Sequence, residues 1–300
     1  MARSLLSYQE PAVQDFFHPA FADAGIFVRV LREDQNNPAV SGNKWWKLRP
    51  YLERAIRSGQ SLVTFGGPWS NHIYATAAAC LEAGIPCTGI IRGERPTVLS
   101  STLQFAERCG MQLEFVSREF YRRKDDAEIR DALVNRFGNC LIVPEGGSGP
   151  EAVEHCAEWG RKIAAQHAFD VLCCPVGTGG TVAGLLRGIS ESIRIIGFSA
   201  LKDGGFLRDA IIQQAAVPDR KNWELLTDFH FGGYGKAPSH LLDFIRDIND
   251  QFSLPLDAVY TGKMVMGLIS LASTGLFPRG ARVLVVHTGG LQGNSGYNWV

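Results

Sequence analysis

Short runs of β-branched and aliphatic residues alternate along the chain with longer segments in which apolar residues recur every three or four positions. The short runs predict strands at 61–67, 85–93, 111–116, 139–147, 169–180, 193–200 and 281–290. The longer segments predict helices at 71–83, 98–109, 119–136, 150–167, 180–190 and 238–252. Such alternation is typical of an α/β fold in which parallel sheets are covered by helices on both faces.

Charge and composition narrow the classes of partner. Among 300 residues, 30 Lys and Arg balance 30 Asp and Glu, and 45% of the residues are hydrophobic. A neutral chain lacks the excess of Lys and Arg that binds nucleic-acid phosphates, and its hydrophobic content predicts a folded core. No run approaches the ~20 apolar residues that cross a bilayer, and the N-terminus does not resemble a secretory signal. We expect a cytoplasmic protein that binds neither nucleic acid nor membrane.

Cysteine and histidine spacing bears on metal and redox chemistry. The seven cysteines are an odd number, include no CxxC pair and lie mostly in apolar segments. Reduced core thiols are the favoured interpretation, with a metal site or a redox pair as the alternatives. The seven histidines show no HExxH or paired-ligand spacing, so no metal is expected.

Glycine is in excess, with 33 residues in 300 against an average usage of about 7%. The excess gathers just after predicted strands, at Gly66–Gly67, Gly146–Gly147, Gly177 with Gly179–Gly180, and Gly289–Gly290. One glycine pair after a strand commonly makes a tight turn and nothing more. In parallel α/β sheets, however, ligands bind beyond the carboxyl ends of the strands, so four such loops together indicate a binding site.

The segment Val176–Gly184, with the sequence VGTGGTVAG, follows a predicted strand and opens a predicted helix. Its glycines let the backbone approach an anion, the helix N-terminus adds positive potential, and Thr178 and Thr181 can add hydroxyl donors. The segment lacks both the P-loop pattern and the GxGxxG spacing of a dinucleotide site. It therefore predicts binding of a small phosphorylated cofactor or substrate.

Lys44 lies in the polar turn SGNK at 41–44, before a helical run through Leu48, Leu52 and Ile56. On this motif alone, most such lysines are solvated surface residues. The alternative is an amine of lowered pKa that forms a covalent imine with an aldehyde. A reactive lysine and a phosphate loop together are what a pyridoxal phosphate enzyme needs.

Six motifs, in their order along the chain, resemble those of 1-aminocyclopropane-1-carboxylate deaminases and D-cysteine desulfhydrases. The motifs are Ser41–Lys44, Gly66–His72, Pro144–Ser148, Val176–Thr181, Tyr260–Lys263 and His287–Gly290. These families are pyridoxal phosphate enzymes of the tryptophan-synthase β-subunit fold group, and the resemblance covers residues 25–292. It implies the type II fold, with two three-layer domains: a large cofactor-binding domain from 1–46 and 146–300, and a small domain at 47–145.

The resemblance also implies how the cofactor would be held. Lys44 would bind it covalently, Asn71 would hydrogen-bond its 3-hydroxyl, and Thr288 would face its pyridine nitrogen. Because a hydroxyl holds a ring proton less well than a carboxylate does, the ring should be a weak electron sink, which suits elimination. The phosphate would be bound by Gly177, Thr178, Gly179, Gly180 and Thr181.

On the substrate side, the resemblance implies that the loop of Ser70, Asn71 and His72 receives the amino-acid carboxylate. Ser70, Tyr234 and Tyr260 match residues on the reacting side of the cofactor in this family. Ser70 has three open roles, as a nucleophile, as a base through a neighbour, or as a carboxylate donor. For the two tyrosines, the alternative is an aromatic side chain that only packs against the fold.

The residue after Tyr260 bears on the reaction, because deaminases of this family typically carry Glu there and desulfhydrases Thr. Thr261, which we expect to contact the substrate, favours β-elimination from a D-amino acid, with D-cysteine giving pyruvate, ammonia and sulfide. The alternatives are a 1-aminocyclopropane-1-carboxylate deaminase and a catalytically silent relative. A nicotinamide-dependent oxidoreductase is disfavoured because the strand 193–200 carries no acidic ribose-binding residue.

Three tryptophans depart from the family pattern. The family usually has a small or polar residue and then Arg where this chain has Trp45 and Trp46, and Pro68-Trp69 replaces an Ile-Gln pair. We expect these indoles to narrow or reshape the pocket beside Lys44 and Ser70. The resemblance further implies a homodimer with the active site between the two domains of each subunit.

Overall fold

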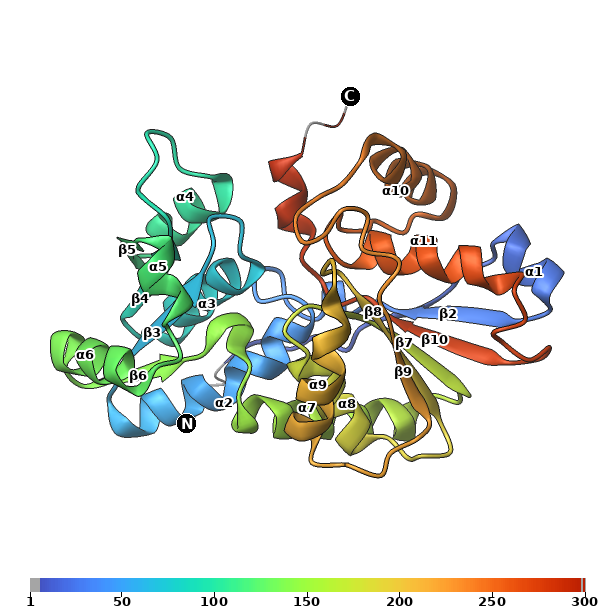
Figure 1. The fold of residues 1–300 in the computed structure, drawn as a ribbon, viewed down its shortest axis with the longest axis horizontal. Helices are drawn as coiled ribbons and strands as arrows, with labels where there is room; N and C mark the ends of the chain where they lie inside the picture. Colours follow the sequence, from blue (N-terminus) through green and yellow to red (C-terminus); the bar gives the residue numbers. More distant parts are fainter. Residues whose placement is uncertain (1–5, 298, 300) are drawn as a thin grey trace.

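The chain forms two parallel sheets that lie apart in space, each flanked by helices (Figure 1). A computed structural model describes residues 6–297 and 299. The larger sheet has the strand order β1–β2–β10–β7–β8–β9, with bounds Val13–Asp15, Phe27–Leu31, Arg282–Val286, Val171–Val176, Arg194–Ser199 and Trp223–Leu226. All its pairings are parallel except that of β1 with β2. The smaller, fully parallel sheet has the order β5–β4–β3–β6, with bounds Gln112–Val116, Cys87–Arg92, Ser61–Gly66 and Cys140–Val143.

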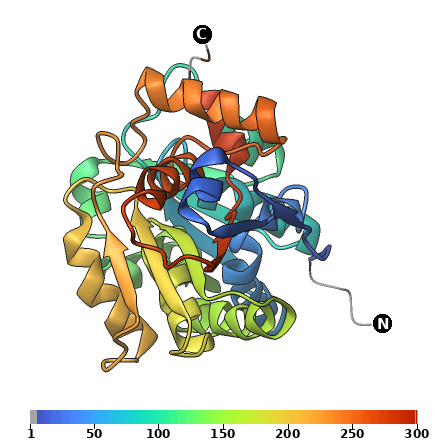
Figure 2. The same cartoon turned by 90° about the vertical axis from the view of Figure 1, so that its right-hand side faces the viewer.

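Helices cover both faces of the larger sheet (Figures 1 and 2). The α-helices are α1 Pro19–Ala24, α2 Asn43–Ser58, α3 Asn71–Ala83, α4 Ser101–Arg108, α5 Arg118–Arg122, α6 Ala127–Phe137, α7 Pro150–Gln166, α8 Gly180–Gly188, α9 Leu207–Ala215, α10 Ser239–Phe252 and α11 Thr261–Ala272. Short 3-10 turns lie at Glu33–Gln35, Glu145–Gly147, Gly204–Phe206 and Leu291–Gly296. Within the described residues, no helix is both long enough and apolar enough to cross a bilayer.

Strand β7 shows why the sheet is buried on both faces. Its side chains alternate, so that Val171 and Cys173 pack with α1, α10 and α11, whereas Leu172 and Cys174 pack with α7, α8 and α9. Because each face meets a layer of helices, both sets are apolar, and the strand is a continuous hydrophobic run. The prediction of parallel sheets flanked by helices is confirmed.

Helix α2 joins the two sheets into one hydrophobic core. Its buried residues include Leu48 and Leu52, which belong to the same cluster as Leu62 of β3 and Leu172 of β7. Helix α2 therefore carries its first turn to the space between the sheets. The sequence-derived domain boundaries, 1–46 and 146–300 with 47–145, remain a proposal that the division into two sheets supports.

The predicted elements differ from the observed ones mainly at their ends. The helix predicted at 119–136 is two helices, α5 and α6, because Ser117 caps the first and the Arg123–Asp126 ion pair holds a turn between them. The strand predicted at 139–147 ends at Val143, since Pro144 cannot donate a ladder hydrogen bond. The prediction left out β1, β2, β9, α1, α9 and α11.

Helices α7 and α8 pack closely enough that two glycines of α8 are needed at the contact. A Cβ atom on Gly184 would lie 2.2 Å from Cβ of Cys156, and one on Gly188 would lie 2.1 Å from the carbonyl oxygen of Ala157. Neither neighbour is a flexible side-chain end, so the helices would have to separate.

We predict that Gly184→Ala destabilises the protein by about 1–3 kcal/mol through overpacking, although alanine favours helices by about 1 kcal/mol. Guanidinium unfolding followed by circular dichroism measures the change. The matched control is Gly205→Ala, because nothing lies within 4 Å of that Cβ position. Equal unfolding midpoints for the two variants would contradict the close packing of α7 and α8.

Candidate active site

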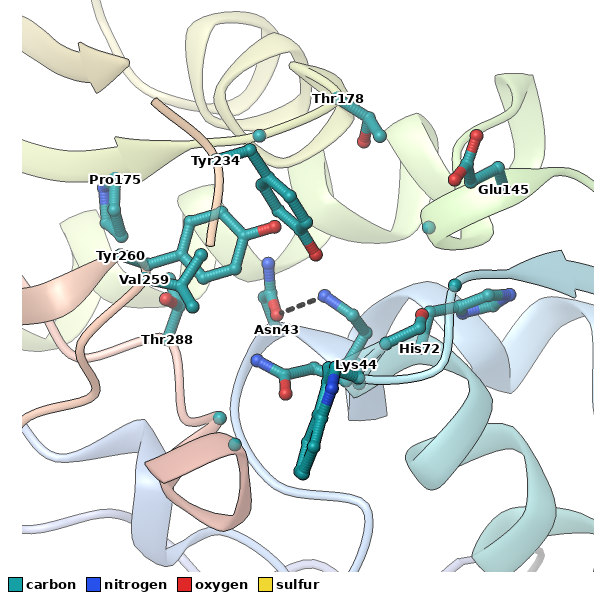
Figure 3. A pocket seen from close by; sticks show the side chains of 18 of the residues that line it. Asn43, Lys44, His72, Glu145, Pro175, Thr178, Tyr234, Val259, Tyr260 and Thr288 are labelled. Atoms are coloured by element: carbon teal, nitrogen blue, oxygen red, sulfur yellow. Dashed lines mark hydrogen bonds between the residues drawn. The ribbon is translucent and has the colours of Figure 1, made fainter. Parts of the chain in front are cut away.

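A cavity of about 780 Å³ lies beyond the carboxyl ends of both sheets (Figure 3). Each of the four glycine loops contributes to its wall, through Gly67 after β3, Gly146 after β6, Gly177 after β7 and Gly289 after β10. The convergence follows from the topology, because parallel strands end at the same edge of a sheet. The loops singled out by their glycine content therefore form one site.

Lys44 reaches the cavity from the first turn of α2, and not from a turn before the helix as its sequence setting indicated. Its Nζ donates to Oδ1 of Asn43 at 3.1 Å, and Nδ2 of Asn43 donates to Oγ1 of Thr181 at 2.8 Å. Asn43 thus links the lysine to the loop after β7. Burial lowers the pKa of Lys44 to about 8, so a substantial fraction of the amine is neutral near neutral pH.

The loop after β7 turns sharply into α8 at Gly179, whose φ is +87°. A Cβ atom on Gly177 would meet the Tyr260 hydroxyl at 2.9 Å, and one on Gly180 would meet Oγ of Ser148 at 2.9 Å. Backbone conformation therefore favours glycine at position 179, and close approach favours it at positions 177 and 180. Gly177, Thr178, Gly179 and Thr181 line the cavity, whereas Gly180 lies behind the wall beside Ser148.

A second lysine, which the sequence analysis did not single out, enters the same end of the cavity. Lys47 is buried, and its Nζ donates to Oγ of Ser148 at 2.8 Å, while Ser148 lies 2.5 Å from Oγ1 of Thr178. Burial and the nearby Lys44 lower the pKa of Lys47 to about 7. The sequence could have identified Lys47 as a site residue by its position, three residues after Lys44 on one face of the same helix.

Helix α3 points its N-terminus into the cavity. Ser70 is the N-cap, with Oγ accepting from the amide of Ile73 at 3.3 Å, and Ser70, Asn71 and His72 all line the wall. Oδ1 of Asn71 accepts a hydrogen bond from Gln292 at 3.0 Å. The first amides of a helix have no partner within the helix and carry positive potential, so this end can bind a carboxylate.

His72 contributes to the wall as a neutral imidazole. The Thr64 hydroxyl donates to the carbonyl of Val143 at 2.9 Å, so it accepts from Nε2 of His72 at 2.7 Å. Burial and the nearby Lys44 and Lys47 hold the pKa of His72 well below its usual range. A buried cation at this position would repel both lysines, so the ring fixes the start of α3 without adding charge.

Two tyrosines form the opposite wall. The rings of Tyr234 and Tyr260 lie edge to face with centroids 6.0 Å apart, and both line the cavity (Figure 3). Burial raises the pKa of both phenols, and the nearby Tyr234 raises the pKa of Tyr260 further. Both side chains are therefore protonated at neutral pH and can donate hydrogen bonds.

The structure corrects the expectation that Thr261 binds the substrate. Its Oγ1 donates to Oδ1 of Asp257 at 2.7 Å and accepts from the Asp257 amide at 2.8 Å. The side chain is fully buried and does not line the cavity. Both of its hydrogen-bonding functions are used in capping α11, so any influence of Thr261 on the substrate passes through its neighbour Tyr260.

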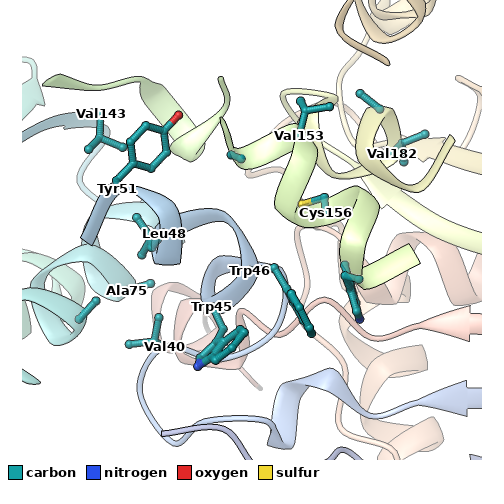
Figure 4. Packing of buried hydrophobic residues seen from close by; sticks show 14 of the residues in the cluster. Val40, Trp45, Trp46, Leu48, Tyr51, Ala75, Val143, Val153, Cys156 and Val182 are labelled. Carbon is teal, nitrogen blue, oxygen red and sulfur yellow. The ribbon is translucent and has the colours of Figure 1, made fainter. Parts of the chain in front are cut away.

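The tryptophans follow the expectation only in part. Trp45 and Trp46 turn away from the cavity into the core, where the Trp46 ring stacks on Trp159 with centroids 5.7 Å apart (Figure 4). The expectation that they narrow the pocket is therefore wrong, because the side chains at positions 45 and 46 of α2 are buried in the core. Trp69, which is 45% exposed, does line the cavity, and so does Thr288.

Sequence comparisons agree with this geometry. A family model described as "Pyridoxal-phosphate dependent enzyme" matches residues 19–289. The chain belongs to this family. It is 30% identical to a putative 1-aminocyclopropane-1-carboxylate deaminase of Pyrococcus horikoshii, over 92% of this chain and 88% of that protein. It is 27% identical to a D-cysteine desulfhydrase of Salmonella choleraesuis, over 89% of this chain and 87% of that protein.

The solved structures give the same result. The crystal structure of a homologue of 1-aminocyclopropane-1-carboxylate deaminase superimposes with a TM-score of 0.81 at 29% identity, over 96% of this chain and 91% of that one. The resemblance drawn from the six motifs is confirmed, and with it the type II fold and the use of pyridoxal phosphate.

The cavity wall fits this cofactor chemically. At one end, Lys47, the Thr178 hydroxyl and the start of α8 line the wall, and Oγ of Ser148 lies within hydrogen-bond distance of both side chains, which suits a phosphate. Lys44, whose pKa is lowered, supplies the amine that an aldehyde requires. The donor set therefore matches both reactive ends of pyridoxal phosphate.

We predict that Lys47→Met weakens pyridoxal phosphate binding by about 10- to 100-fold, because a hydrogen bond to a charged group contributes about 1.5–3 kcal/mol. Reconstitution of the apoenzyme, followed by visible absorption, gives the affinity. The exposed residue Lys221 provides the matched control, Lys221→Met.

The pH dependence has a definite sign. The advantage of the wild-type apoenzyme over Lys47→Met in binding inorganic phosphate should shrink as pH rises through about 7, because Lys47 then loses its proton, whereas the ionisation of phosphate itself affects both proteins. Identical pH profiles for the two proteins would rule out Lys47 as a phosphate ligand.

Proposed function

We propose that the protein catalyses β-elimination from a small D-amino acid, with D-cysteine converted to pyruvate, ammonia and sulfide. The observation that carries this proposal is Lys44, which enters the cavity between a carboxylate-binding helix end and a pair of protonated tyrosines. Pyridoxal phosphate, when bound, supplies an aldehyde for the amino group and a ring that withdraws electrons from the α-carbon. The remaining steps fall to side chains of this chain.

The N-terminus of α3 would bind and orient the substrate carboxylate. Ser70 and Asn71 stand at its start and line the cavity, so the amides of this first turn lie at the cavity wall. The carboxylate would be held on the small-domain side, with the α-carbon turned toward Lys44. This arrangement favours Ser70 as a carboxylate donor, because its Oγ already serves as the helix cap and no base lies within hydrogen-bond distance of it among the described residues.

Lys44 would move the first proton. With a pKa of about 8, its amine is neutral often enough near neutral pH to take the α-proton of the substrate. When the C–S bond breaks, the electron pair leaves with sulfur. Tyr234 or Tyr260 would then donate a hydrogen bond to the departing hydrosulfide, since both phenols stay protonated at neutral pH. Hydrolysis of the remaining enamine carbon skeleton gives the keto acid and ammonia.

Thr261 supports a D-cysteine desulfhydrase over a 1-aminocyclopropane-1-carboxylate deaminase. Opening a cyclopropane that has no α-proton needs a further nucleophile or acid–base group at the reacting end of the site. Family deaminases carry a carboxylate after the tyrosine, whereas this chain has a hydroxyl committed to Asp257. The putative deaminase names of the archaeal relatives make the cyclopropane substrate the second candidate.

The resemblance also supports a homodimer in the cytoplasm that uses a small amino acid as its substrate. A domain arrangement in which the site lies between the two sheets agrees with the cavity, whose wall is drawn from both. Each subunit would then carry a complete set of the proposed site residues.

The test is a substrate panel of D-cysteine, L-cysteine, D-serine and 1-aminocyclopropane-1-carboxylate, with keto acid release as the readout. We expect the highest kcat/KM for D-cysteine, with sulfide released in equal amount. Fastest turnover of the cyclopropane substrate would instead assign the deaminase activity. Absence of turnover for the whole panel would contradict both.

Lys44→Ala separates cofactor binding from catalysis. We expect the visible absorption of the lysine-bound cofactor to disappear and turnover to fall by at least 10³-fold, because both the covalent anchor and the proposed base are lost. The exposed Lys221→Met again serves as the control. Unchanged absorption in Lys44→Ala would show that another residue binds the cofactor.

A further inference from the structure

The loop that carries Tyr234 has an unusual backbone. Phe231, Gly232, Gly233 and Gly235 all have positive φ, with values of +50°, +93°, +109° and +69°. For Phe231, a non-glycine residue, this conformation is strained, and the glycines make the unfolded loop especially flexible. Tyr234 lies between these residues and is itself 48% exposed, although its ring meets Tyr260, so the conformation of the loop decides where the ring lies.

A buried lysine binds this loop from beneath. Lys263 lies in α11 and is only 2% exposed, although it is a cation. Its Nζ donates to the carbonyl oxygens of His230 and Gly233, each at 2.8 Å. These carbonyls lie on either side of the positive-φ residues Phe231 and Gly232. The Gly233 amide also donates to the His230 carbonyl at 3.0 Å, so the ammonium group fixes a turn that leads into Tyr234 and ties it to α11.

The same helix holds the second tyrosine. Oδ2 of Asp257 accepts the amides of Val259 and Tyr260, each at 2.9 Å, and its Oδ1 accepts the amide of Thr261. Asp257 thus holds Tyr260 at the N-terminus of α11, one turn before Lys263. The two tyrosines face each other because their backbones are bound to neighbouring turns of one helix.

From this arrangement we propose that Lys263 is a positioning residue for Tyr234: its two hydrogen bonds to the 230–233 backbone hold the Tyr234 phenol against Tyr260 in the active site. Lys263 does not line the cavity, so it acts through the loop and not on the substrate. The proposal rests on the function proposed above, in which Tyr234 faces the reacting atoms. This positioning role explains why the charged side chain of Lys263 is buried beneath the loop, where two backbone carbonyls accept its hydrogen bonds.

The surroundings of Lys263 agree with a role in holding the loop. Burial lowers its pKa to about 8, while the charge of Asp257 acts in the opposite direction. Other contacts bind the same segment, among them hydrogen bonds from the Gly232 amide to Nδ1 of His230 and from the Lys236 amide to the Gly233 carbonyl. Phe229 packs its ring on Gly267 of α11, where a Cβ atom would lie 2.7 Å away, and the Tyr297 hydroxyl donates to the carbonyl of Gly235 at 3.0 Å. The ends of the segment stay attached without Lys263, so its loss frees chiefly the part that contains Tyr234.

A double-mutant cycle of Lys263→Met and Tyr234→Phe tests the proposal. We expect Lys263→Met to lower kcat for the preferred substrate by 10- to 100-fold with little change in KM, because a displacement of about 1 Å can cost this much. In the Tyr234→Phe background, Lys263→Met should have almost no further effect on kcat. The visible absorption of the bound cofactor should stay unchanged in every variant. A full additional loss of kcat in the double variant would overturn the proposal, because Lys263 would then act independently of Tyr234.

A second readout does not depend on activity. Trypsin can cut after Lys236, an exposed residue of the same loop whose amide donates to Gly233. We expect cleavage at this bond to be at least tenfold faster in Lys263→Met than in the wild type. The matched control is Lys202→Met, because Lys202 is exposed and touches the loop at Gly233 without a hydrogen bond to it.

The outcomes separate the two proposals. If Tyr234→Phe leaves kcat unchanged, the proposed role of Tyr234 is wrong, and the trypsin rate alone decides whether Lys263 holds the loop. An unchanged trypsin rate in Lys263→Met overturns the positioning role whatever the kinetics show. Where Lys263→Met does not fold, Lys263→Gln, which keeps a donor for one carbonyl, should give intermediate values of both kcat and trypsin rate.

Discussion

The site depends on how the chain holds the backbone of one residue, Gly42, two residues before the cofactor lysine. Asn36 accepts the Gly42 amide at 2.9 Å and donates to its carbonyl at 3.1 Å, while the backbone of Glu33 accepts the same amide. Gly42 has a φ of +68°, and a Cβ atom there would lie 1.9 Å from the Thr288 carbonyl oxygen. The lysine turn therefore lies directly on the loop after β10, and only glycine allows this contact.

From this contact, Lys44 and the phosphate end of the cavity are joined by α2. Since Lys44 and Lys47 lie on one face of that helix, the covalent anchor and a phosphate ligand share one rigid element. Helix α2 is also part of the core that links both sheets. Because α2 packs against both sheets, the two lysines keep a fixed position relative to the loop after β7 and to the start of α3.

Sequence alone could predict the parts of this site that depend on local pattern. Apolar periodicity and glycine after strands located the sheets and the loops around the cavity, and motif order located Lys44 and the loop after β7. The sequence alone could not show which way a side chain faces where that direction depends on how helices and strands pack against one another. Thr261 was expected at the substrate, yet its hydroxyl caps α11 at Asp257, and Trp46 was expected in the pocket, yet it lies in the core. Lys47 was missed because its burial results from tertiary packing.

The position of Trp46 also explains how this chain differs from the family pattern of Arg at that place. Glu33 is fully buried behind the lysine turn and accepts hydrogen bonds from the indoles of Trp46 and Trp159, at 3.3 and 2.8 Å, and from Asn36 at 2.6 Å. The side chains that donate to Glu33 are neutral, whereas the family pattern has an Arg cation at position 46. Burial therefore raises the pKa of Glu33 to about 7. Because its pKa in the unfolded chain is near 4.5, the folded state is stabilised less as pH rises from about 4.5 to 7. Glu33 thus orients Asn36, and through it Gly42, at a cost in stability near neutral pH, as is common where a protein keeps a buried charge for the geometry of its site.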